Sequence, residues 1–334
     1  MPLTANPVVY NGEDTNLLVA ETLRGTNLVA KSGHRVLQGY KSTAHWGTLE
    51  GDACLGAYEL CATTIQDQRY EEYSTPLTRF QANFRIRHDS LRATLREKYY
   101  RAGQLNGSFL DDSEVQRLLL DIITKKLGTA ADQILMRGGS YYAFGDGCID
   151  LNLLQGIMAQ LRNDNNVPEV VATDSTTVAT SPTTGVFSAF DRALAALPEY
   201  LRFTSDPERK LKIYASPTVA QAFHRSISQI GGGSYYVAIT QGGSPQFVAN
   251  QTYPTGLHGD GMIEVVTLSE IPAGKFYITW PGNIGIFYDD ANDFANVLMV
   301  DGRNSVGICD YVEMRVNALM GVDVFRPEEA VVAI

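Results

Sequence analysis

The sequence has little cysteine, and its four cysteines are widely separated. They are Cys54, Cys61, Cys148 and Cys309, and no two of them form a CxxC pair. This spacing does not match zinc or dithiol redox motifs, so we expect buried free thiols in a reducing compartment. Cys61 or Cys148 could act as a nucleophile with a distant histidine, but no neighbouring residue supports that role.

Long apolar runs and a targeting signal are also missing. No run approaches the roughly 20 residues that a membrane-spanning helix needs. The N-terminus, Met1 to Thr4, has no basic stretch leading into an apolar one, so we expect no signal peptide. We therefore expect a soluble intracellular chain, in which the glycosylation-like triplets at Asn106 and Asn250 have no meaning.

Basic residues are outnumbered by acidic ones. The 334 residues include 27 Lys and Arg against 37 Asp and Glu, a formal net charge of −10. Direct nucleic-acid binding is disfavoured, because counterion release requires clustered Lys and Arg. An acidic chain can still form a wall around nucleic acid that it does not trap. The length and an apolar content of 44 % indicate a globular protein with two or more domains.

Local motifs for chemistry are absent as well. The sequence contains no P-loop, GxSxG elbow, HExxH, EF-hand loop or dinucleotide-binding GxGxxG. The string from His258 to Gly261 could hold a metal but is more typical of a turn. The stretches from Gly231 to Ser234 and from Gly242 to Ser244 resemble phosphate-binding loops only in composition. We expect no cofactor, no metal and no enzyme activity, although catalytic groups need only meet in space.

The strongest positive signal is a helical pattern from Asp111 to Arg137. Asp111 can cap the start with Glu114 three residues on, and Gly138-Gly139 supplies a stop. About 27 residues at 1.5 Å each give a helix of about 40 Å. It is either a long core helix or a rigid spine that carries a plate-shaped subunit. Its apolar stripe consists of Val115, Leu118, Leu119, Ile122, Ile123, Leu127, Ala130, Ala131, Ile134 and Leu135.

Three segments precede this helix. Residues 1–33 show no core-forming pattern beyond a short helix at Leu17–Leu23, and we interpret them as an extended arm on another surface, such as a neighbour's. Residues 34–87 read as β-structure whose long two-stranded excursion is marginal alone and usually lies across a partner. Residues 88–102 are predicted to be a helix with a basic side. That side is either simply solvated or a patch that meets an acidic surface on an adjacent chain, or packaged DNA.

After the long helix, helices interleave with strands, which indicates an α+β layout. The predicted helices are Asp150–Arg162, Phe187–Leu201 and, opened by Pro217, Thr218–Ile230. The turn-rich residues 163–185 could hold a polar strand at Thr173–Thr180. The other predicted strands are Arg35–Trp46, Tyr58–Ile65, Leu77–Arg87, Leu211–Ala215, Ile263–Leu268, Phe276–Thr279, Ile284–Tyr288, Val297–Val300, Val312–Leu319 and Gly321–Phe325.

This order of elements resembles the major capsid protein of tailed bacteriophages, the HK-ninety-seven-type shell fold, and specifically its crAss-like branch. Asp89–Tyr100 (DSLRATLREKYY) and the helix ending LMRGGS resemble the paired spine helices and their glycine exit. The segment IDLNLLQGIMAQLRND (149–164) looks like the family's following helix. LKIYASPTVAQAFHR (211–225) is similar to a strand–Pro–helix unit of the axial domain, and YVEMRVNALMGVDVFRPEEAVV (311–332) looks like the closing strand, glycine turn and Pro-containing exit.

The resemblance implies a domain division and a function. Residues 1–33 would be the N-arm, 34–87 the E-loop, 88–167 the peripheral domain with the spine helix, 168–308 the axial domain, and 309–334 the return to the peripheral domain. The chain would assemble as hexamers and pentamers into the icosahedral shell around phage double-stranded DNA. Separate scaffolding, portal and cement or head-fibre proteins are expected partners. The expected location is the virion, assembled in the host bacterial cytoplasm.

Intersubunit contacts are the site that this interpretation predicts. We expect acidic residues of one copy, Glu71, Glu72 or Asp111, to pair with arginines of a neighbour near the base of the loop. Other virion structural proteins, such as tail or decoration proteins, or a hydrolase with a spatially assembled site are the alternative functions. The candidate arginines are Arg79, Arg85, Arg87, Arg92 and Arg96.

Overall fold

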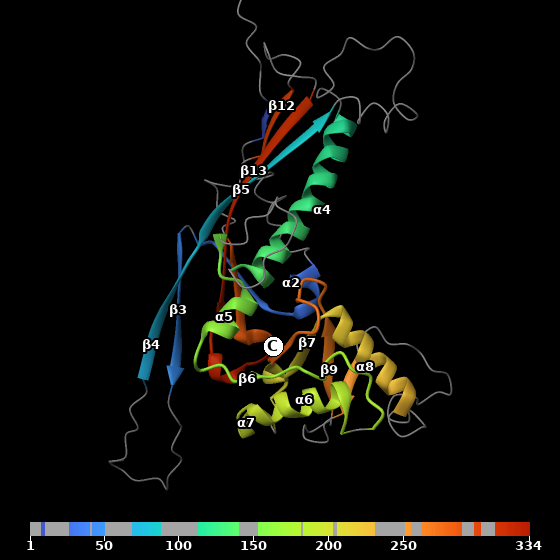
Figure 1. Ribbon diagram of the computed structural model, residues 1–334. Helices are drawn as coiled ribbons and strands as arrows, with labels where there is room; N and C mark the ends of the chain where they lie inside the picture. Colours follow the sequence, from blue (N-terminus) through green and yellow to red (C-terminus); the bar gives the residue numbers. More distant parts are fainter. Residues whose placement is uncertain are drawn as a thin grey trace, which may run out of the picture.

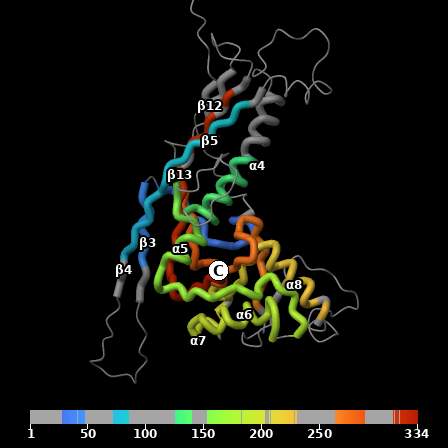
Figure 2. Tube along the Cα trace, in the orientation of Figure 1, coloured from blue at the N-terminus to red at the C-terminus, as the bar shows by residue number. Residues whose placement is uncertain are grey.

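The computed structural model describes residues 8–10, 27–40, 42–50, 69–87, 113–139, 153–181, 183–202, 206–230, 251–254, 262–288, 297–301 and 311–334. A sheet flanked by a long helix forms one end of the molecule (Figure 1). A second sheet with its covering helices forms the other end, and a two-stranded ribbon projects from the side (Figure 2). This mixture of helices and sheets confirms the predicted α+β class.

The first sheet, here called the long sheet, is organised around β13 (Tyr311–Val324). The ten residues of β5 pair antiparallel with Tyr311–Met320 of β13. The chain's early and late segments therefore meet in one sheet. Its path is β1 (Val8–Tyr10), β12 (Val297–Asp301), β13, β11 (Ile284–Tyr288) and β2 (Arg35–Gln38), with β5 (Thr78–Arg87) joined to β13.

β13 runs unbroken through Gly321, where the sequence predicted a turn between two strands. Gly321 pairs with Phe287 in the ladder between β11 and β13. A Cβ atom at position 321 would lie 2.8 Å from Leu77 Cδ2. The missing side chain at Gly321 therefore leaves space for Leu77 of the same chain. The strand continues through Gly321, so the predicted turn is wrong.

The long helix α4 (Ser113–Arg137) confirms the central prediction from the sequence. It runs beside the long sheet (Figure 1). Its last three turns bury Leu127, Ala131, Ile134 and Leu135 in the same apolar cluster as Phe80 and Val316 of that sheet. The apolar stripe that repeats every 3.6 residues along α4 thus faces the long sheet and fixes the position of the helix on it.

The segment after α4 forms a shorter helix than predicted. α5 spans Ile157–Asn163, whereas the sequence predicted a helix from Asp150. Gly156 precedes it in an extended conformation, and its N–H donates to the Gly138 carbonyl at 2.8 Å. A Cβ at Gly156 would lie 2.6 Å from the Gly138 nitrogen. This close backbone approach stops α4 and delays the start of α5.

The second sheet, here called the compact sheet, carries two helices that are predicted well. α6 (Gly185–Ala196) and α8 (Pro217–Ile230) contact it and each other through Phe190, Phe223 and Phe276. The ring centroids of Phe190 and Phe276 are 5.0 Å apart. Its strand order is β6 (Glu169–Val170), β14 (Val331–Ala333), β10 (Phe276–Thr279), β7 (Lys212–Ala215), β9 (Met262–Thr267) and β8 (Gln251–Pro254).

Two local predictions near this sheet are wrong. The predicted helix Phe187–Leu201 is two helices, because Pro198 holds Leu197 extended and separates α6 from α7 (Glu199–Arg202). The predicted polar strand Thr173–Thr180 is a run of turns. Backbone hydrogen bonds close these turns, with the Ser175 N–H donating to the Ala172 carbonyl and the Thr177 N–H to the Asp174 carbonyl. Short 3₁₀ turns occupy Pro207–Arg209 (η3), Pro281–Asn283 (η4) and Pro327–Glu329 (η6).

The ribbon consists of β3 (Thr43–Glu50) and β4 (Arg69–Pro76). They pair antiparallel over their full length, from Thr43 opposite Pro76 to Glu50 opposite Arg69. It extends away from both sheets (Figure 1). The described strands β2 and β5 on either side of the ribbon belong to the long sheet, so the projection is shorter than the predicted segment 34–87.

The described parts of the N-terminal segment lie on the chain's own body. β1 pairs with β12, with Val8 opposite Met299. The helix α2 (Asn27–Ser32) buries Leu28, whose N–H donates to the Asp132 carboxylate of α4 at 3.3 Å. For these residues the prediction of an arm on another surface is wrong, because short apolar stretches find partners within the same chain.

Other predicted features lie outside the described residues. They include the basic helix and several candidate sites. Among the described helices, none is both long and apolar enough to cross a membrane. The undescribed features are Leu17–Leu23, Tyr58–Ile65, residues 88–102, the four cysteines, Asn106, Asn250, residues 231–234 and 242–244, and the string His258–Gly261.

His34 fixes the chain between α2 and β2. Its Nδ1–H donates to the Pro281 carbonyl at 3.2 Å, and the Tyr277 hydroxyl donates to Nε2 at 3.0 Å. The ring lies 4.8 Å from that of Tyr214, whose hydroxyl donates to the Ser32 carbonyl. Burial lowers the pKa of His34 to about 3, with a smaller lowering by the charge of Lys212. The imidazole is therefore neutral in the folded chain.

This neutral histidine makes the fold sensitive to acid. The unfolded chain binds a proton near the ordinary histidine pKa of 6.5, while the folded chain binds it only near 3. Stability is therefore complete above 6.5 and is lost as the pH falls below it. Between about pH 7 and about pH 5 we expect His34 to cost about 2 kcal/mol of unfolding free energy. Urea unfolding of the unassembled chain and of the His34→Gln variant at both pH values measures this loss of unfolding free energy. An equal loss in the two proteins would contradict its assignment to His34.

Candidate interaction surface

The ribbon has no apolar core of its own. β3 and β4 pair only with each other among the described strands. A two-stranded hairpin is marginally stable in water, so its stability and direction depend on how its root joins the body. The root is where β3 and β4 meet the long sheet, and the Leu77 N–H closes it by donating to the Ser42 carbonyl at 2.9 Å.

An aromatic stack, here called the ribbon seat, holds the root on the long sheet. The Trp46 ring stacks on Tyr73 across the ribbon, with centroids 4.4 Å apart and planes at 15°. The Trp46 ring also contacts the ring of Phe325, which lies just after β13, with centroids 4.5 Å apart and planes at 57°. A Cβ at Gly285 of β11 would clash with the Phe325 ring. A glycine in the sheet thus makes room for the ring on which Trp46 rests.

A chain of polar groups accompanies the seat. The Trp46 Nε1–H donates to Thr75 Oγ1 at 3.0 Å, and the Thr75 hydroxyl donates to Asp323 of β13. The second Asp323 oxygen accepts the Val324 N–H at 2.9 Å. Burial raises the pKa of Asp323, as does the negative charge of Asp164, while these hydrogen bonds oppose the rise. A partly desolvated carboxylate therefore ties the ribbon to the longest strand.

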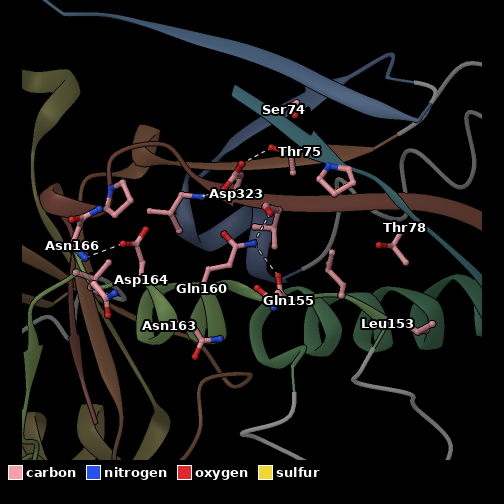
Figure 3. Close-up of a pocket in the computed structure, with 17 residues that line it drawn as sticks. Ser74, Thr75, Thr78, Leu153, Gln155, Gln160, Asn163, Asp164, Asn166 and Asp323 are labelled. Atoms are coloured by element: carbon pink, nitrogen blue, oxygen red, sulfur yellow. Dashed lines mark hydrogen bonds between the residues drawn. The ribbon is translucent and has the colours of Figure 1, made fainter. Parts of the chain in front are cut away.

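An open pocket of about 740 Å³ lies beside the root. Figure 3 shows its walls, which are β4 and the start of β5 on one side and α5 with the loop after it on the other. Its lining residues are Ser74, Thr75, Pro76, Thr78, Leu153, Leu154, Gln155, Gln160, Asn163, Asp164, Asn165, Asn166, Val167, Val322, Asp323, Val324 and Pro327.

The neighbouring surface of β5 and β13 is basic. Arg79 and Arg85 of β5 are exposed, and Arg315 of β13 is exposed beside them. Glu313 lies within this face, 3.0 Å from Arg315 and 3.8 Å from Arg85. Because the arginines of both pairs are exposed to solvent, these ion pairs contribute little to stability. The face, here called the basic face, is therefore available to an acidic surface without loss of the fold.

The structure places the predicted contact residues on two separate surfaces. Glu71 and Glu72 are on β4 of the ribbon, with Glu72 exposed and 3.7 Å from His45. Arg79, Arg85 and Arg87 are on β5. The predicted contact residues Arg92, Arg96 and Asp111 lie outside the described residues.

The buried carboxylate most suggestive of catalysis is structural. Glu329 is fully buried and accepts hydrogen bonds from Trp280 Nε1 at 2.6 Å, Tyr200 at 2.9 Å and Arg326 at 3.0 Å. Burial and this carboxylate raise the pKa of Tyr200 to about 12. The carboxylate thus joins α7, η4 and η6. In the part of the chain that the structure describes, no group of three or more His, Cys, Asp or Glu could hold a metal ion.

Solved capsid structures match this chain over nearly its whole length. A procapsid protein of satellite phage P4, solved with the size determination protein, is 12 % identical with a TM-score of 0.54 and covers 96 % of this chain and 98 % of that chain. The chain has the fold of phage capsid proteins. The capsid of Myoviridae phage XM1 gives 12 % identity and a TM-score of 0.52, over 92 % of this chain and 90 % of that chain.

A capsid of an empty GTA particle is also similar. It is 13 % identical with a TM-score of 0.53, over 92 % of this chain and 89 % of that chain. No protein-family model and no curated protein sequence matches this chain. The similarity therefore lies in the arrangement of elements and confirms the predicted fold class.

Sequence reasoning missed the residues that hold the ribbon. Trp46 was counted only as a strand former, and Phe325, Asp323 and Gly285 belong to distant segments. A large aromatic at the end of a polar strand was the one available signal, because such a ring requires an apolar partner. Its partners depend on the pairing of β11 with β13, which no local pattern reveals.

The seat predicts a local effect of removing Trp46. Trp46→Ala loses the stack and the hydrogen bond to Thr75, which we expect to weaken the root by about 2 kcal/mol. Amide exchange in 43–50 and 69–76 should then become roughly 30-fold faster, while β10 and β11 keep their protection. The matched control is His45→Ala, an exposed neighbour on β3. Equal amide exchange rates in the ribbon of both variants would contradict the role of Trp46 in the ribbon seat.

Proposed function

We propose that this chain is the major capsid protein of a tailed phage, which assembles as hexamers and pentamers into an icosahedral shell around double-stranded DNA. The observation that carries the proposal is the fold shared with capsid proteins over 96 % of this chain and 98 % of the phage P4 protein. A subunit that shares the whole arrangement of elements, and not one domain, places the corresponding elements where sister copies can contact them.

The physics of the ribbon supports the proposal. A stable contact between two proteins buries roughly 1,600 Å². A projection of two eight-residue strands without a core becomes stable when it lies across another surface. Copies of the same chain supply that surface at high local concentration within a shell.

We further propose the domain division that the resemblance implies. The N-arm would be residues 1–33, of which 8–10 and 27–32 lie on the chain's own body, and the E-loop would be 34–87, of which only the part between β2 and β5 projects. The peripheral domain would be 88–167 with 309–334, and the axial domain 168–308. The finer placement in the crAss-like branch belongs to the same proposal. So do separate scaffolding, portal and cement or head-fibre proteins, and assembly in the host bacterial cytoplasm. A structural role without enzyme activity agrees with a satisfied Glu329.

The contacts between copies follow from charge. We propose that Glu71 and Glu72 on the ribbon of one copy lie over the basic face of the next, against Arg79, Arg85 and Arg87. Arg92, Arg96 and Asp111 would extend this contact. Glu72 and Arg85 are both exposed, and their present neighbours, His45 and Glu313, are at 3.7 and 3.8 Å. Complementary charges of this kind set register and speed association more than they add affinity.

Electron microscopy tests the function directly. The chain is expressed alone and with its virion partners, and the products are imaged by negative stain. We expect closed shells, or rings of six and five copies. A compact monomer under every condition would contradict the proposal.

Charge exchange tests the contact. Arg85→Glu with Arg87→Glu places like charges opposite the ribbon, and we expect the critical concentration for assembly to rise about tenfold or more. Adding Glu71→Arg and Glu72→Arg should restore assembly. Lys125→Glu with Lys126→Glu on α4 is the control for net charge. An unchanged critical concentration and salt tolerance in the Arg85/Arg87 variant would rule out this pairing.

A further inference from the structure

The pocket beside the ribbon root is acidic and rich in hydrogen-bond acceptors. Asp164 and Asp323 are among its 17 described lining residues, and none of the 17 is a lysine, arginine or histidine. The other polar lining groups are hydroxyls and amides, and Figure 3 shows them converging from β4, β13 and α5. The pocket is open to solvent, so a side chain from outside can enter it. Its charge favours a cation.

The hydrogen bonds already made in this pocket leave acceptors for a further donor. The Gln160 amide nitrogen donates to the carbonyls of Gln155 at 3.0 Å and Val322 at 2.7 Å, which leaves the amide oxygen as an acceptor. Asp164 uses Oδ1 to accept the Asn166 N–H at 2.9 Å, which leaves Oδ2 for another donor. A cation with several N–H donors therefore fits this pocket better than another acceptor does.

The two carboxylates of the pocket repel each other. Burial raises the pKa of Asp323, and the negative charge of Asp164 raises it further. A cation between the two carboxylates stabilises both charges, and a guanidinium can donate to two carboxylates at once. This stabilisation is largest at the partly desolvated root, where the effective dielectric is lower than in water.

Arg315 of β13 is an exposed arginine with donors to spare. Its side chain is 49 % exposed and donates to Glu313 Oε1 from Nε at 3.1 Å and from Nη2 at 3.0 Å. Three of the five guanidinium N–H groups remain for another acceptor. Asp323 is eight residues further along the same unbroken strand, about 26 Å away. Because this distance exceeds the reach of one side chain, Arg315 cannot bind the pocket of its own copy.

The ribbon face that carries Glu72 continues into the pocket. Because side chains alternate along a strand, Glu72, Ser74 and Pro76 lie on one face of β4. All three are exposed, and Ser74 and Pro76 line the pocket. Ser74 is two residues, or about 7 Å, from Glu72. A surface that covers Glu72 therefore also reaches the mouth of the pocket.

The basic face has a second cation at a matching distance. Arg315 is opposite Asn83 in the ladder between β5 and β13, so it lies two residues along and one strand across from Arg85, about 8 Å away. Glu313 contacts both arginines, which places them on the same face of the long sheet. If Glu72 of one copy pairs with Arg85 of the next, and β4 runs antiparallel to β5, the pocket lies over Arg315.

The charges favour this antiparallel orientation. It places a cation opposite the ribbon glutamate and another opposite the pocket, whereas a parallel orientation moves the pocket past the end of β5 at Arg87. We infer that the pocket of one copy binds the Arg315 guanidinium of an adjacent copy through Asp164 and Asp323. This inference rests on the proposed shell function and on its ribbon contact.

A charge exchange tests the inference in assembled shells. Asp164→Lys places a cation in the pocket, and we expect a five- to tenfold higher critical concentration for assembly, about 1 to 1.4 kcal/mol. Arg315→Glu alone should have a similar effect, and the two substitutions together should recover most of the loss. Glu199→Lys on α7 and Lys126→Glu on α4 make the same charge changes at exposed sites and should have little effect.

Neutral variants separate a lost contact from a lost fold. In Asp164→Asn and Arg315→Gln we expect weaker assembly with an unchanged free energy of unfolding in urea. An increase in critical concentration that only follows a loss of unfolding free energy would contradict the inference.

Chemical coupling identifies the occupant. Isotopically labelled copies with Arg315→Lys are assembled with unlabelled, unmodified copies, and a carbodiimide joins the new amine to a carboxylate in direct contact. We expect a peptide that joins position 315 of a labelled copy to Asp164 or Asp323 of an unlabelled copy. Coupling only to Glu313 of the same copy would overturn the inference.

The outcomes distinguish this inference from the proposed function. Shells that form without the intercopy peptide and without recovery by the charge exchange would overturn the inference and leave the shell function standing. Coupling of the pocket to a different virion protein would also overturn it. Absence of shells from the unmodified chain would remove both proposals.

Discussion

The direction of the ribbon in this molecule depends on the contact of Trp46 with Phe325. The ribbon has only its two strands, so its own hydrogen bonds do not fix its direction. Trp46 stacks on Tyr73 and makes a tilted ring contact with Phe325, which couples the ribbon to the end of β13. The absence of a side chain at Gly285 leaves room for the Phe325 ring. A projection held in this way can present its charges at a set distance from the body.

β13 connects that root with the rest of the chain. The strand is 14 residues long and pairs with β5, β11 and β12, so the ribbon root and the sheet beside α4 share one element. The buried cluster that contains Leu135 and Val316 packs the helix against the strand. A load on the ribbon is thereby transmitted to the whole body, as the proposed shell function requires. Basic side chains remain on β5 even though the net charge is −10.

The predictable part of the fold was the part with strong local periodicity. α4, α8, β10 and β11 were found because their apolar spacing and their caps agree with the final packing. The errors occurred where a glycine leaves space for a residue that is distant in sequence. Gly321 was interpreted as a turn because the approach of Leu77 is not visible locally, and α5 was extended backwards because Gly156 meets Gly138 across the fold.

The candidate surface was predicted only in its charges. The acidic pair on β4 and the arginines of β5 were identified from the sequence, but the seat and the pocket were not. The seat depends on Phe325 and the pocket on Asp323, which are about 250 to 280 residues from Trp46 and Thr75 in sequence. Contacts of this range follow from topology, which composition and periodicity do not specify.

Hydrogen exchange compared between unassembled chains and assembled particles tests the central claim most directly. If the ribbon is a surface built to lie on a sister copy, residues 43–50 and 69–76 will gain strong protection on assembly, while the buried strands β10 and β11 will change little. The same ribbon protection in both states would contradict the account, because the ribbon would then need no adjoining copy.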